Sequence, residues 1–550
     1  MSRGAVDVVR GVVLPRPDGG TTAPMDLHLA GGRVGTVVPS SGTRGNSTSG
    51  RVLDAGGRLA LPGLVDAHVH AGGAVLDAGV QHALLRQGVT AVVTGADGVG
   101  FAPSDRTAYE WACGYFAGID GEHPRFSGGT LAQLLATYDG ATAVNVAALV
   151  PHGTVRRLVV GTEQRPARPA EVDRMVRVAR QAFAEGAVGL STGLEYVPAA
   201  WADEAELVAL ARVAAEHGLP HVSHMRGYEA AAVPALAELF RLAAASGVAT
   251  HVSHLHGPAA AITGVLDDAR AGGLDVTFDS YPYLQGSSIL AMVALPTWLP
   301  LADPDATIAA LDAPALARRL RDHLAGLDDL WHRVTLAWVP GLDPDEGDVA
   351  GRRLVDVAAR WGVAPADAAL RVLRASRLRA ACVFAQPDTN DADAVRTLAN
   401  HPAHLGGSDA IYQPVGAGAC AGRPHPRGWG AFARFLAEHV RTGGDWTWHD
   451  AVEHLSARAA RRFGLADRGS LEAGSVADVV LVDPLAVADR ATYDRPRTPA
   501  VGIDDVLVAG VPVLTHGELT GRRPGRGLRP SVRAGHPTPP AVPAGTEGAP

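Results

Sequence analysis

Residues 203–255 decide the fold class: DEAELVALARVAAEHGLPHVSHMRGYEAAAVPALAELFRLAAASGVATHVSHL. The segment opens with a predicted helix, 203–218, which starts on acidic residues and ends at glycine, as capping and the helix dipole favour. Predicted strands follow at 220–225 and 249–255, and both contain the tetrapeptide His-Val-Ser-His. The two copies stand thirty residues apart, which is the length of one βα unit.

The same alternation of short apolar strands and helices continues on both sides of this segment. A second clear helix spans 171–186, and further predicted strands lie at 64–70, 90–97, 144–150, 186–192, 275–281, 335–339 and 403–409. We therefore predict an α/β protein with a (β/α)8 TIM-like barrel over residues 62–465. Residues 296–375 carry more helix than a barrel needs, and we interpret them as an inserted cap.

The two ends of the chain have a different texture, with apolar and polar residues alternating between Gly and Pro. This pattern covers 6–14, 25–38, 51–63, 475–484 and 502–521, and it is typical of short strands. We predict that residues 1–61 and 466–530 pair into one small β-sandwich. Residues 531–550 are rich in Pro, Gly and Ala, which predicts a disordered tail.

Composition narrows the class of function. The 550 residues are 47% apolar and carry a net charge of -8, which is typical of a soluble globular protein and argues against nucleic acid as a partner. No apolar run is long enough for a membrane span, and the N-terminus shows no secretory signal. Three cysteines make no disulfide framework, so we expect a cytoplasmic protein. The oligomeric state is left open.

Two histidines follow the first predicted barrel strand. His68 and His70 stand two residues apart, so on a strand their side chains point the same way. Imidazole suits zinc and similar ions, and the carboxyl ends of barrel strands are where active sites lie. The alternative is that they are merely two hydrogen-bonded histidines at a strand end.

His224 and His254 close the two copies of the His-Val-Ser-His tetrapeptide. Adjacent parallel strands would place these two side chains next to each other at the rim that carries the first pair. His221 and His251, three residues earlier in each copy, should lie deeper on the opposite face, and we predict a structural role for them.

Two carboxylates complete the candidate metal site. Asp409 ends the last predicted barrel strand, where it would act as general base and then as acid to the leaving amine, although Asp is also common as a helix N-cap. Asp97 ends the second strand, before Gly98, where it could equally be a turn residue. The chain contains no lysine, so a carboxylated lysine cannot bridge two metals, and Asp97 is the best bridging ligand.

Several motifs, in their order along the chain, resemble the N-acyl-D-amino-acid deacylases of the metal-dependent amidohydrolase superfamily. The resemblance covers the chain up to about residue 530, and its most specific segments are GLSTGLEYVP and DSYPY. The motifs are PGLVDAHVH (62–70), GVTAVVTGADG (88–98), GLSTGLEYVP (189–198), SHMR (223–226), SHLHG (253–257), DSYPYLQGSS (279–288), GGSDA (406–410) and HPRGWGAFARFL (425–436).

The resemblance implies hydrolysis of an N-acyl-D-amino acid to a carboxylate and a free D-amino acid by a distorted barrel with a β-sandwich. One zinc ion would be held tightly and a second more weakly. The tight ligands would be Asp97, His224 and His254, and the weaker ones His68, His70 and Asp409. The matching substrate-pocket positions are Tyr196, Arg226, Tyr283 and Ser287.

Two positions depart from the family pattern. Asp97 stands where the best-known members carry Cys, and an oxygen ligand should loosen zinc selectivity and admit Mn or Co. The lysine expected to contact the substrate is His256 here, which is mostly neutral at pH 7, so Arg226 or another arginine would bind a carboxylate.

The same residues are compatible with other functions. A hydantoinase-like cyclic-amide hydrolase, a dihydroorotase-like enzyme or a dipeptide hydrolase would use the same ligands with a different pocket. A non-catalytic scaffold would have lost the metal. A serine hydrolase is suggested by GLSTG (189–193), which formally matches GxSxG, but its continuation favours a substrate loop.

Overall fold

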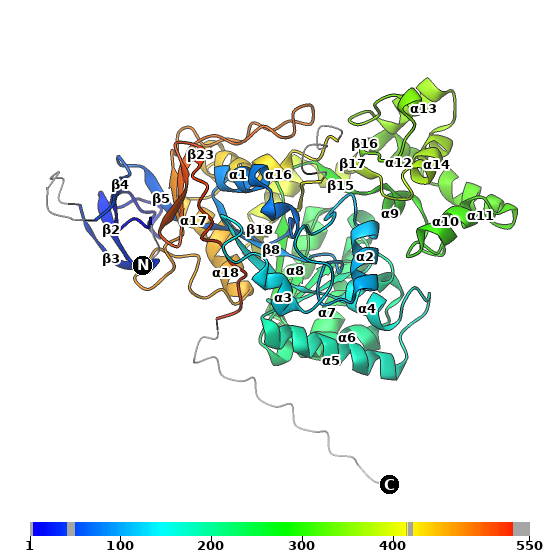
Figure 1. The fold of residues 1–550 in the computed structure, drawn as a ribbon, viewed down its shortest axis with the longest axis horizontal. Helices are drawn as coiled ribbons and strands as arrows, with labels where there is room; N and C mark the ends of the chain where they lie inside the picture. Colours follow the sequence, from blue (N-terminus) through cyan, green and yellow to red (C-terminus); the bar gives the residue numbers. More distant parts are fainter. Residues whose placement is uncertain (1–3, 41–49, 414, 416–421, 532–550) are drawn as a thin grey trace, which may run out of the picture.

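The computed structural model describes residues 4–40, 50–413, 415 and 422–531. Figure 1 shows strands at the centre of the molecule with helices around them, two smaller sheets at the N-terminal side, and a helical lobe (α10 to α14) at the opposite side. The protein is therefore of the α/β class. Among the described residues, no helix is both long and apolar enough to cross a membrane.

Parallel strands form the centre in three hydrogen-bonded groups. The six-stranded sheet has the order β10-β11-β12-β13-β14-β18, and two smaller groups have the orders β6-β8-β9 and β19-β7. Their bounds are β6 Leu64–Asp66, β7 Val69–His70, β8 Val89–Thr94, β9 Asn145–Ala148, β10 Val150–Pro151, β11 Leu190–Gly193, β12 His221–His224, β13 Thr250–Val252, β14 Val276–Ser280, β18 His404–Gly406 and β19 Ala410–Ile411.

Main-chain contacts connect the three groups. Only Leu149 separates β9 from β10 in the chain. At the other side, the Ala67 amide donates to the Gly406 carbonyl at 3.2 Å, and the Asp409 amide donates to the His68 carbonyl at 2.8 Å. The first and the last parallel strands of the chain are thus neighbours in space.

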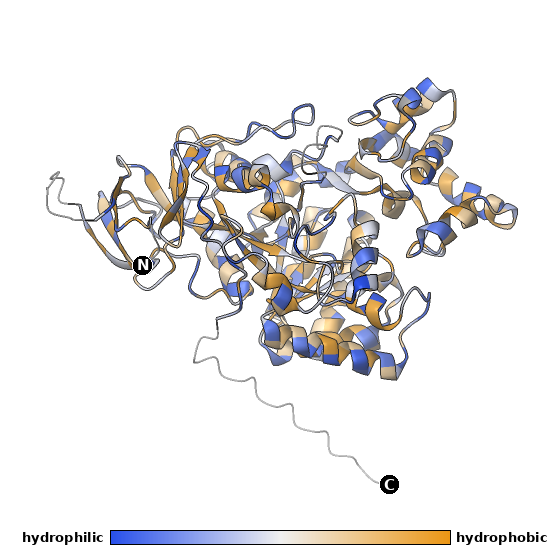
Figure 2. Ribbon diagram, viewed as in Figure 1, coloured by the Kyte–Doolittle hydropathy of each residue, from blue (hydrophilic) through white to orange (hydrophobic). Residues whose placement is uncertain are grey.

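Helices cover the outside of these strands. Figure 2 shows that they are hydrophobic on one side and hydrophilic on the other. In α5 (Pro169–Glu185) the buried residues Met175, Ala179, Ala182 and Phe183 follow the helical repeat. The helix ends at Gly186 in the left-handed conformation, φ 112°, which glycine adopts without strain. The others are α1 Ala78–Arg86, α2 Arg106–Tyr115, α3 Leu131–Ala136, α4 His152–Val159, α6 Glu204–Glu216, α7 Ala232–Ser246, α8 Ala259–Ala271, α15 Ala392–Ala399, α16 Arg427–Phe435, α17 Trp448–Val452 and α18 Arg458–Arg462.

Both ends of the chain contribute to one pair of sheets. A four-stranded sheet has the order β3-β2-β1-β4, and a five-stranded sheet the order β23-β22-β21-β20-β5, in which β5 from the N-terminal part is antiparallel to β20. Val9, Leu27, Leu481 and Leu507 share one buried apolar cluster with other residues of these sheets. The bounds are β1 Val8–Val12, β2 Met25–Ala30, β3 Arg33–Pro39, β4 Val52–Asp54, β5 Leu59–Pro62, β20 Val479–Val482, β21 Ile503–Val508, β22 Val511–Thr515 and β23 Glu518–Leu519.

Residues 285–385 form a separate lobe between β14 and β18. It has an antiparallel sheet of order β15-β17-β16 and an apolar cluster of its own, which includes Leu336 and Cys382. The lobe is longer than the expected cap, 296–375, because β15 pairs with β17 and so closes it. Its elements are β15 Gln285–Ile289, α9 Leu290–Ala294, α10 Pro304–Leu311, α11 Pro314–Ala325, α12 Asp328–Arg333, β16 Val334–Trp338, α13 Leu354–Trp361, α14 Pro365–Ala375 and β17 Ala381–Ala385.

Some expectations fall on residues that are not described. The expected tail, 531–550, lies outside the described residues except for residue 531, and Cys420 lies outside them too. Cys113 and Cys382 are buried free thiols.

Candidate metal centre

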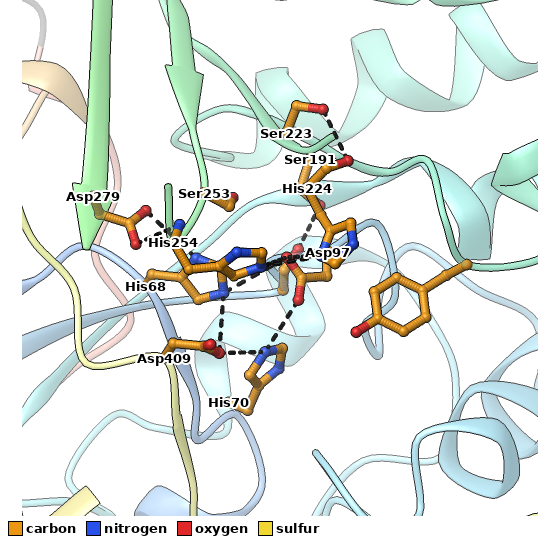
Figure 3. A network of polar contacts seen from close by, with 12 residues as sticks. His68, His70, Asp97, Ser191, Ser223, His224, Ser253, His254, Asp279 and Asp409 are labelled. Atoms are coloured by element: carbon orange, nitrogen blue, oxygen red, sulfur yellow. Dashed lines mark hydrogen bonds and ion pairs between the residues drawn. The ribbon is translucent and has the colours of Figure 1, made fainter. Parts of the chain in front are cut away.

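The two histidines of the first strand face the two predicted carboxylates. His68 Nε2 lies 3.6 Å from Asp97 Oδ1 and 3.6 Å from Asp409 Oδ1. His70 Nε2 lies 3.4 Å from Asp97 Oδ2 and 3.5 Å from Asp409 Oδ1. All four side chains are buried. Figure 3 shows that these residues reach the same small volume from segments that are far apart in the sequence.

The second histidine pair meets the same aspartate. His224 Nδ1 and His254 Nε2 are 3.0 Å apart and lie 3.8 Å and 3.6 Å from Asp97 Oδ1. They come from β12 and from the residues after β13, which are neighbouring parallel strands. His221 and His251 belong to neither group: His221 Nε2 pairs with Thr192 Oγ1 at 2.8 Å, and His251 Nε2 with Asp279 Oδ2 at 2.9 Å.

The residues fall into two overlapping sets that could each hold a metal ion. One set is His68, His70, Asp97 and Asp409, and the other is Asp97, His224 and His254; within each set the ligand atoms lie within 4.8 Å of one another. His68 Nε2 and Asp97 Oδ1 are buried and have no hydrogen-bond partner among the described residues. Buried polar atoms normally have a partner, and imidazole with carboxylate is a donor set that suits zinc. The residues therefore fit a metal.

The charges around the site favour a cation. Burial by itself lowers the pKa of His68, but Asp279 and Asp97 outweigh it and raise this pKa to about 9. Burial likewise raises the pKa of Asp97, yet His68 and His254 bring it well below the usual aspartate value. These buried carboxylates therefore stay ionised, and their field would stabilise a bound divalent ion.

The backbone at three of these residues is unusual. Asp97, His254 and Asp409 have φ of 55°, 34° and 47°, in the left-handed region that non-glycine residues seldom occupy. Such conformations cost free energy and cluster at functional sites. Here they turn the chain at the ends of strands so that the three side chains converge.

A ring of polar residues behind the ligands was not predicted from the sequence. Asp279 Oδ2 lies 3.5 Å from His68 Nδ1 and 2.9 Å from His251 Nε2, and its Oδ1 accepts the His254 amide at 2.9 Å. Asp279 starts the DSYPY motif, which was the available signal. Three further partners belong to this ring: Asp120 beside His70 Nδ1 at 3.5 Å, Glu195 at 2.8 Å from His224 Nε2, and Arg427 Nη2 at 2.8 Å from Asp409 Oδ2.

A cavity of about 360 Å³ opens onto the metal residues. Three predicted pocket residues, Tyr196, His256 and Ser287, line it. Tyr196 Oη lies 3.1 Å from Ser288 Oγ, and the His256 ring stacks on Tyr228 with centroids 4.7 Å apart.

The predictions for Arg226 and Tyr283 need correction, because neither lines this cavity. Arg226 is held at the surface, with Nε 3.1 Å from Glu238 of α7 and Nη1 donating to the Ala200 carbonyl at 2.8 Å. The Tyr283 ring lies beneath the guanidinium of Arg434, 4.7 Å from it, where it lines a neighbouring cavity. Tyr281, two residues earlier, lines the cavity at the metal residues instead.

Ser191 of the GLSTG segment does not form a serine hydrolase site. Its hydroxyl is buried and donates to the main-chain carbonyls of Gly95 and Val150 rather than to a histidine. A serine nucleophile needs a general base within hydrogen-bond reach, so the serine mechanism is excluded for this residue.

Comparison with known proteins agrees with this geometry. The model of the amidohydrolase family matches residues 51–514. The chain belongs to the amidohydrolase family. This amidohydrolase is 34% identical over 523 residues to the N-acyl-D-glutamate deacylase of Alcaligenes xylosoxydans xylosoxydans, covering 93% of this chain and 94% of the relative. It thus groups with the N-acyl-D-amino-acid deacylases.

Solved structures extend the comparison. The N-acyl-D-glutamate deacylase of Bordetella bronchiseptica, complexed with zinc and a phosphonate inhibitor, is 30% identical to this amidohydrolase, with a TM-score of 0.76 and coverage of 96% of this chain and 100% of that one. A D-aminoacylase structure, described for its binuclear metal centre, is 27% identical, with a TM-score of 0.76 and coverage of 95% and 100%.

Proposed function

We propose that this amidohydrolase cleaves the amide bond of N-acyl-D-amino acids, releasing a carboxylate and a free D-amino acid. The observation that carries the proposal is the pair of ligand sets sharing Asp97, with Asp409 beside them, on the wall of one cavity. The likeness to named deacylases over most of the chain supports the substrate class.

We infer that the fold is a (β/α)8 barrel with a β-sandwich from both chain ends. Eight strand positions support it, namely β6/β7, β8, β9/β10, β11, β12, β13, β14 and β18/β19, and the contacts of Ala67 and Asp409 close the ring. The two sheets that share β5 and β20 would be the sandwich, in the domain order set out above. We also propose a cytoplasmic location. The free thiols of Cys113 and Cys382 support this location.

Zinc is the metal proposed for the site, in one or two ions. Asp97, His224 and His254 would hold one ion, and His68, His70, Asp97 and Asp409 the other. When bound, a divalent metal polarises the amide carbonyl and lowers the pKa of water toward neutrality. The carboxylate of Asp97 faces histidines of both sets, with Oδ1 toward His68, His224 and His254 and Oδ2 toward His70, and would be shared between the two positions.

Asp409 is proposed as general base and acid. Burial raises its pKa, but Arg427 and His70 outweigh burial and lower it, so the carboxylate is ionised and can accept a proton. Arg427 occupies Oδ2, and Oδ1 faces the ligand histidines. Asp409 would accept a proton from the attacking water while the water oxygen bonds to the acyl carbon. It would then donate this proton to the amide nitrogen as the C–N bond breaks. Tyr196, His256 and Ser287 would position the substrate from the cavity wall.

The test is Asp409→Asn, assayed with N-acetyl-D-amino acids, their L-enantiomers and hydantoins. We expect kcat to fall by about 100- to 10,000-fold, the usual share of a general acid–base, while the zinc held by Asp97, His224 and His254 is retained. Asp348→Asn, an exposed carboxylate, is the control. Full activity of Asp409→Asn would overturn the assignment of the base. Turnover of hydantoins without turnover of linear amides would overturn the proposed reaction.

A further inference from the structure

Part of the cavity wall is apolar. The lobe 285–385 supplies Met292 and Val293 from α9, Leu327 and Leu330 at α12, and Phe384 from β17. These five side chains are partly exposed although the lobe has a buried core of its own. They therefore present apolar surface to the cavity, and a ligand that covers it is favoured by the hydrophobic effect.

The barrel side continues this wall. Ile119 and Ile411 line the same cavity, and both are buried in a cluster that also contains Tyr196. Apolar side chains from two separate parts of the fold thus line the same cavity as the metal residues.

The cavity has little positive charge for a second carboxylate. Among the described lining residues, Arg333 is the one permanent cation, because the chain has no lysine. Arg333 Nε lies 3.0 Å from Asp329 Oδ2, and its Nη1 donates to the Ala385 carbonyl at 2.9 Å. One guanidinium can serve the single α-carboxylate that every N-acyl-amino acid carries, which leaves none for an acidic side chain.

Two carboxylates in the cavity lining would also repel an acidic side chain of the substrate. Glu195 lines the cavity and pairs with His224, its Oε2 lying 2.8 Å from His224 Nε2. Glu229 also lines the cavity and has no ion pair among the described residues. A substrate carboxylate placed near them would meet like charge and lose water without gaining a partner.

We infer, on the basis of the proposed deacylase function, that this cavity selects N-acyl-D-amino acids with an apolar substituent and rejects those with a second carboxylate. The preference would therefore differ from that named for the N-acyl-D-glutamate deacylases similar to this chain. The apolar group is either the D-amino-acid side chain or the acyl chain, and the two sources are separated by experiment.

The experiment compares kcat/KM in two substrate series with the zinc-loaded enzyme. The first holds the acetyl group constant and compares D-leucine with D-glutamate; the second holds D-alanine constant and compares N-butyryl with N-succinyl. We expect kcat/KM for the apolar substrate to exceed kcat/KM for the acidic substrate by about 100-fold or more in at least one series. Equal values, or a preference for the acidic member, in both series would overturn the inference. No hydrolysis in either series would instead refute the proposed function.

Variants locate the wall. We expect Leu330→Arg to lower the ratio of kcat/KM for the apolar substrate to that for the acidic substrate by about 10-fold or more. Met292→Arg, on a different helix, should do the same. Both effects should arise mainly from a lower KM for the acidic substrate. Val363→Arg is the control, because Val363 is exposed on the same lobe and does not line the cavity. An unchanged ratio in both wall variants would refute the assignment of this wall as the specificity determinant.

Discussion

Asp279 is not a candidate metal ligand, yet its carboxylate contacts three histidines, and two of these are candidate ligands. Its Oδ2 lies 2.9 Å from His251 Nε2 and 3.5 Å from His68 Nδ1, while Oδ1 accepts the His254 amide. A carboxylate behind a ligating imidazole fixes the ring orientation and its tautomer. Asp279 is therefore a positioning residue.

Replacing this carboxylate should weaken metal binding without unfolding the protein. We expect Asp279→Asn to lower the affinity for zinc by about 10- to 100-fold, the usual effect of such outer partners. Competition with a chromogenic chelator measures it directly. Asp275→Asn is a matched control, because Asp275 precedes the same strand but pairs with Arg462 at the surface. Equal zinc affinities of Asp279→Asn and wild type would contradict the positioning role.

The chemistry of Asp97 should set the choice of metal. Its oxygens are harder donors than a thiolate, so the site should accept Mn or Co beside zinc. We expect Asp97→Cys to raise the zinc-to-manganese ratio by about 10-fold when the metal-free protein is equilibrated with both ions. Elemental analysis after desalting gives the ratio. The same ratio for variant and wild type would show that the ligand atom at residue 97 does not set selectivity.

At the scale of elements, the βα repeat explains why distant residues meet. Parallel strands β12 and β13 pair in register His221 to Thr250, so the ends of the two copied tetrapeptides lie side by side. Helices hold the strands in place, and one buried ion pair joins two of them. Glu206 of α6 contacts His152 Nε2 at 2.8 Å and the guanidinium of Arg156, both on α4.

Removing this buried charge should destabilise the region formed by α4 and α6. All three side chains are fully buried, so Glu206→Gln leaves Arg156 without a charged partner and should cost about 3–5 kcal/mol. Urea denaturation at pH 7 measures the change. Glu204→Gln, exposed on the same helix, is the control and should stay close to wild type. Equal midpoints for Glu206→Gln and wild type would contradict the role of the pair.

The same glutamate predicts an acid-side pH dependence. Burial raises its pKa, but His152 and Arg156 outweigh burial and lower it to about 2. A folded-state pKa below the unfolded value stabilises the fold above the unfolded pKa and loses this contribution as pH falls through the folded pKa. The contribution is therefore complete above pH 4.5, the ordinary glutamate value, and is lost toward pH 2. Glu206→Gln should flatten the fall in stability over this interval.

For the whole molecule, the paired ends of the chain form one structural unit with the central parallel strands. Both faces of β20 are buried. Val479 and Leu481 belong to the cluster between the two terminal sheets, and Val480 and Val482 belong to the cluster that contains residues of the central strands. The run Val-Val-Leu-Val is continuously apolar for this reason. Residues near 480 thereby tie both ends of the chain to the strands that carry the metal residues.

A cavity in this layer should lower stability while the metal site stays intact. Leu481 is 0% exposed, and we expect Leu481→Ala to cost about 2–5 kcal/mol and to lower Tm. Differential scanning calorimetry and zinc content together check it. Leu485→Ala is the control, since Leu485 is 84% exposed only four residues later. A Tm for Leu481→Ala equal to that of the control would contradict the packing role.

The sequence by itself determined the α/β class and the candidate ligands. Periodicity and the repeated His-Val-Ser-His tetrapeptide are local properties, and strand parity places His68 and His70 on one side without any tertiary information. Only the tertiary structure decided that Arg226 and Tyr283 lie outside the cavity lining, because their contact partners, Glu238 and Arg434, come from other elements. It also decided the roles of Asp279 and of the apolar wall, since contacts between segments more than a hundred residues apart depend on how the strands close and where the lobe packs.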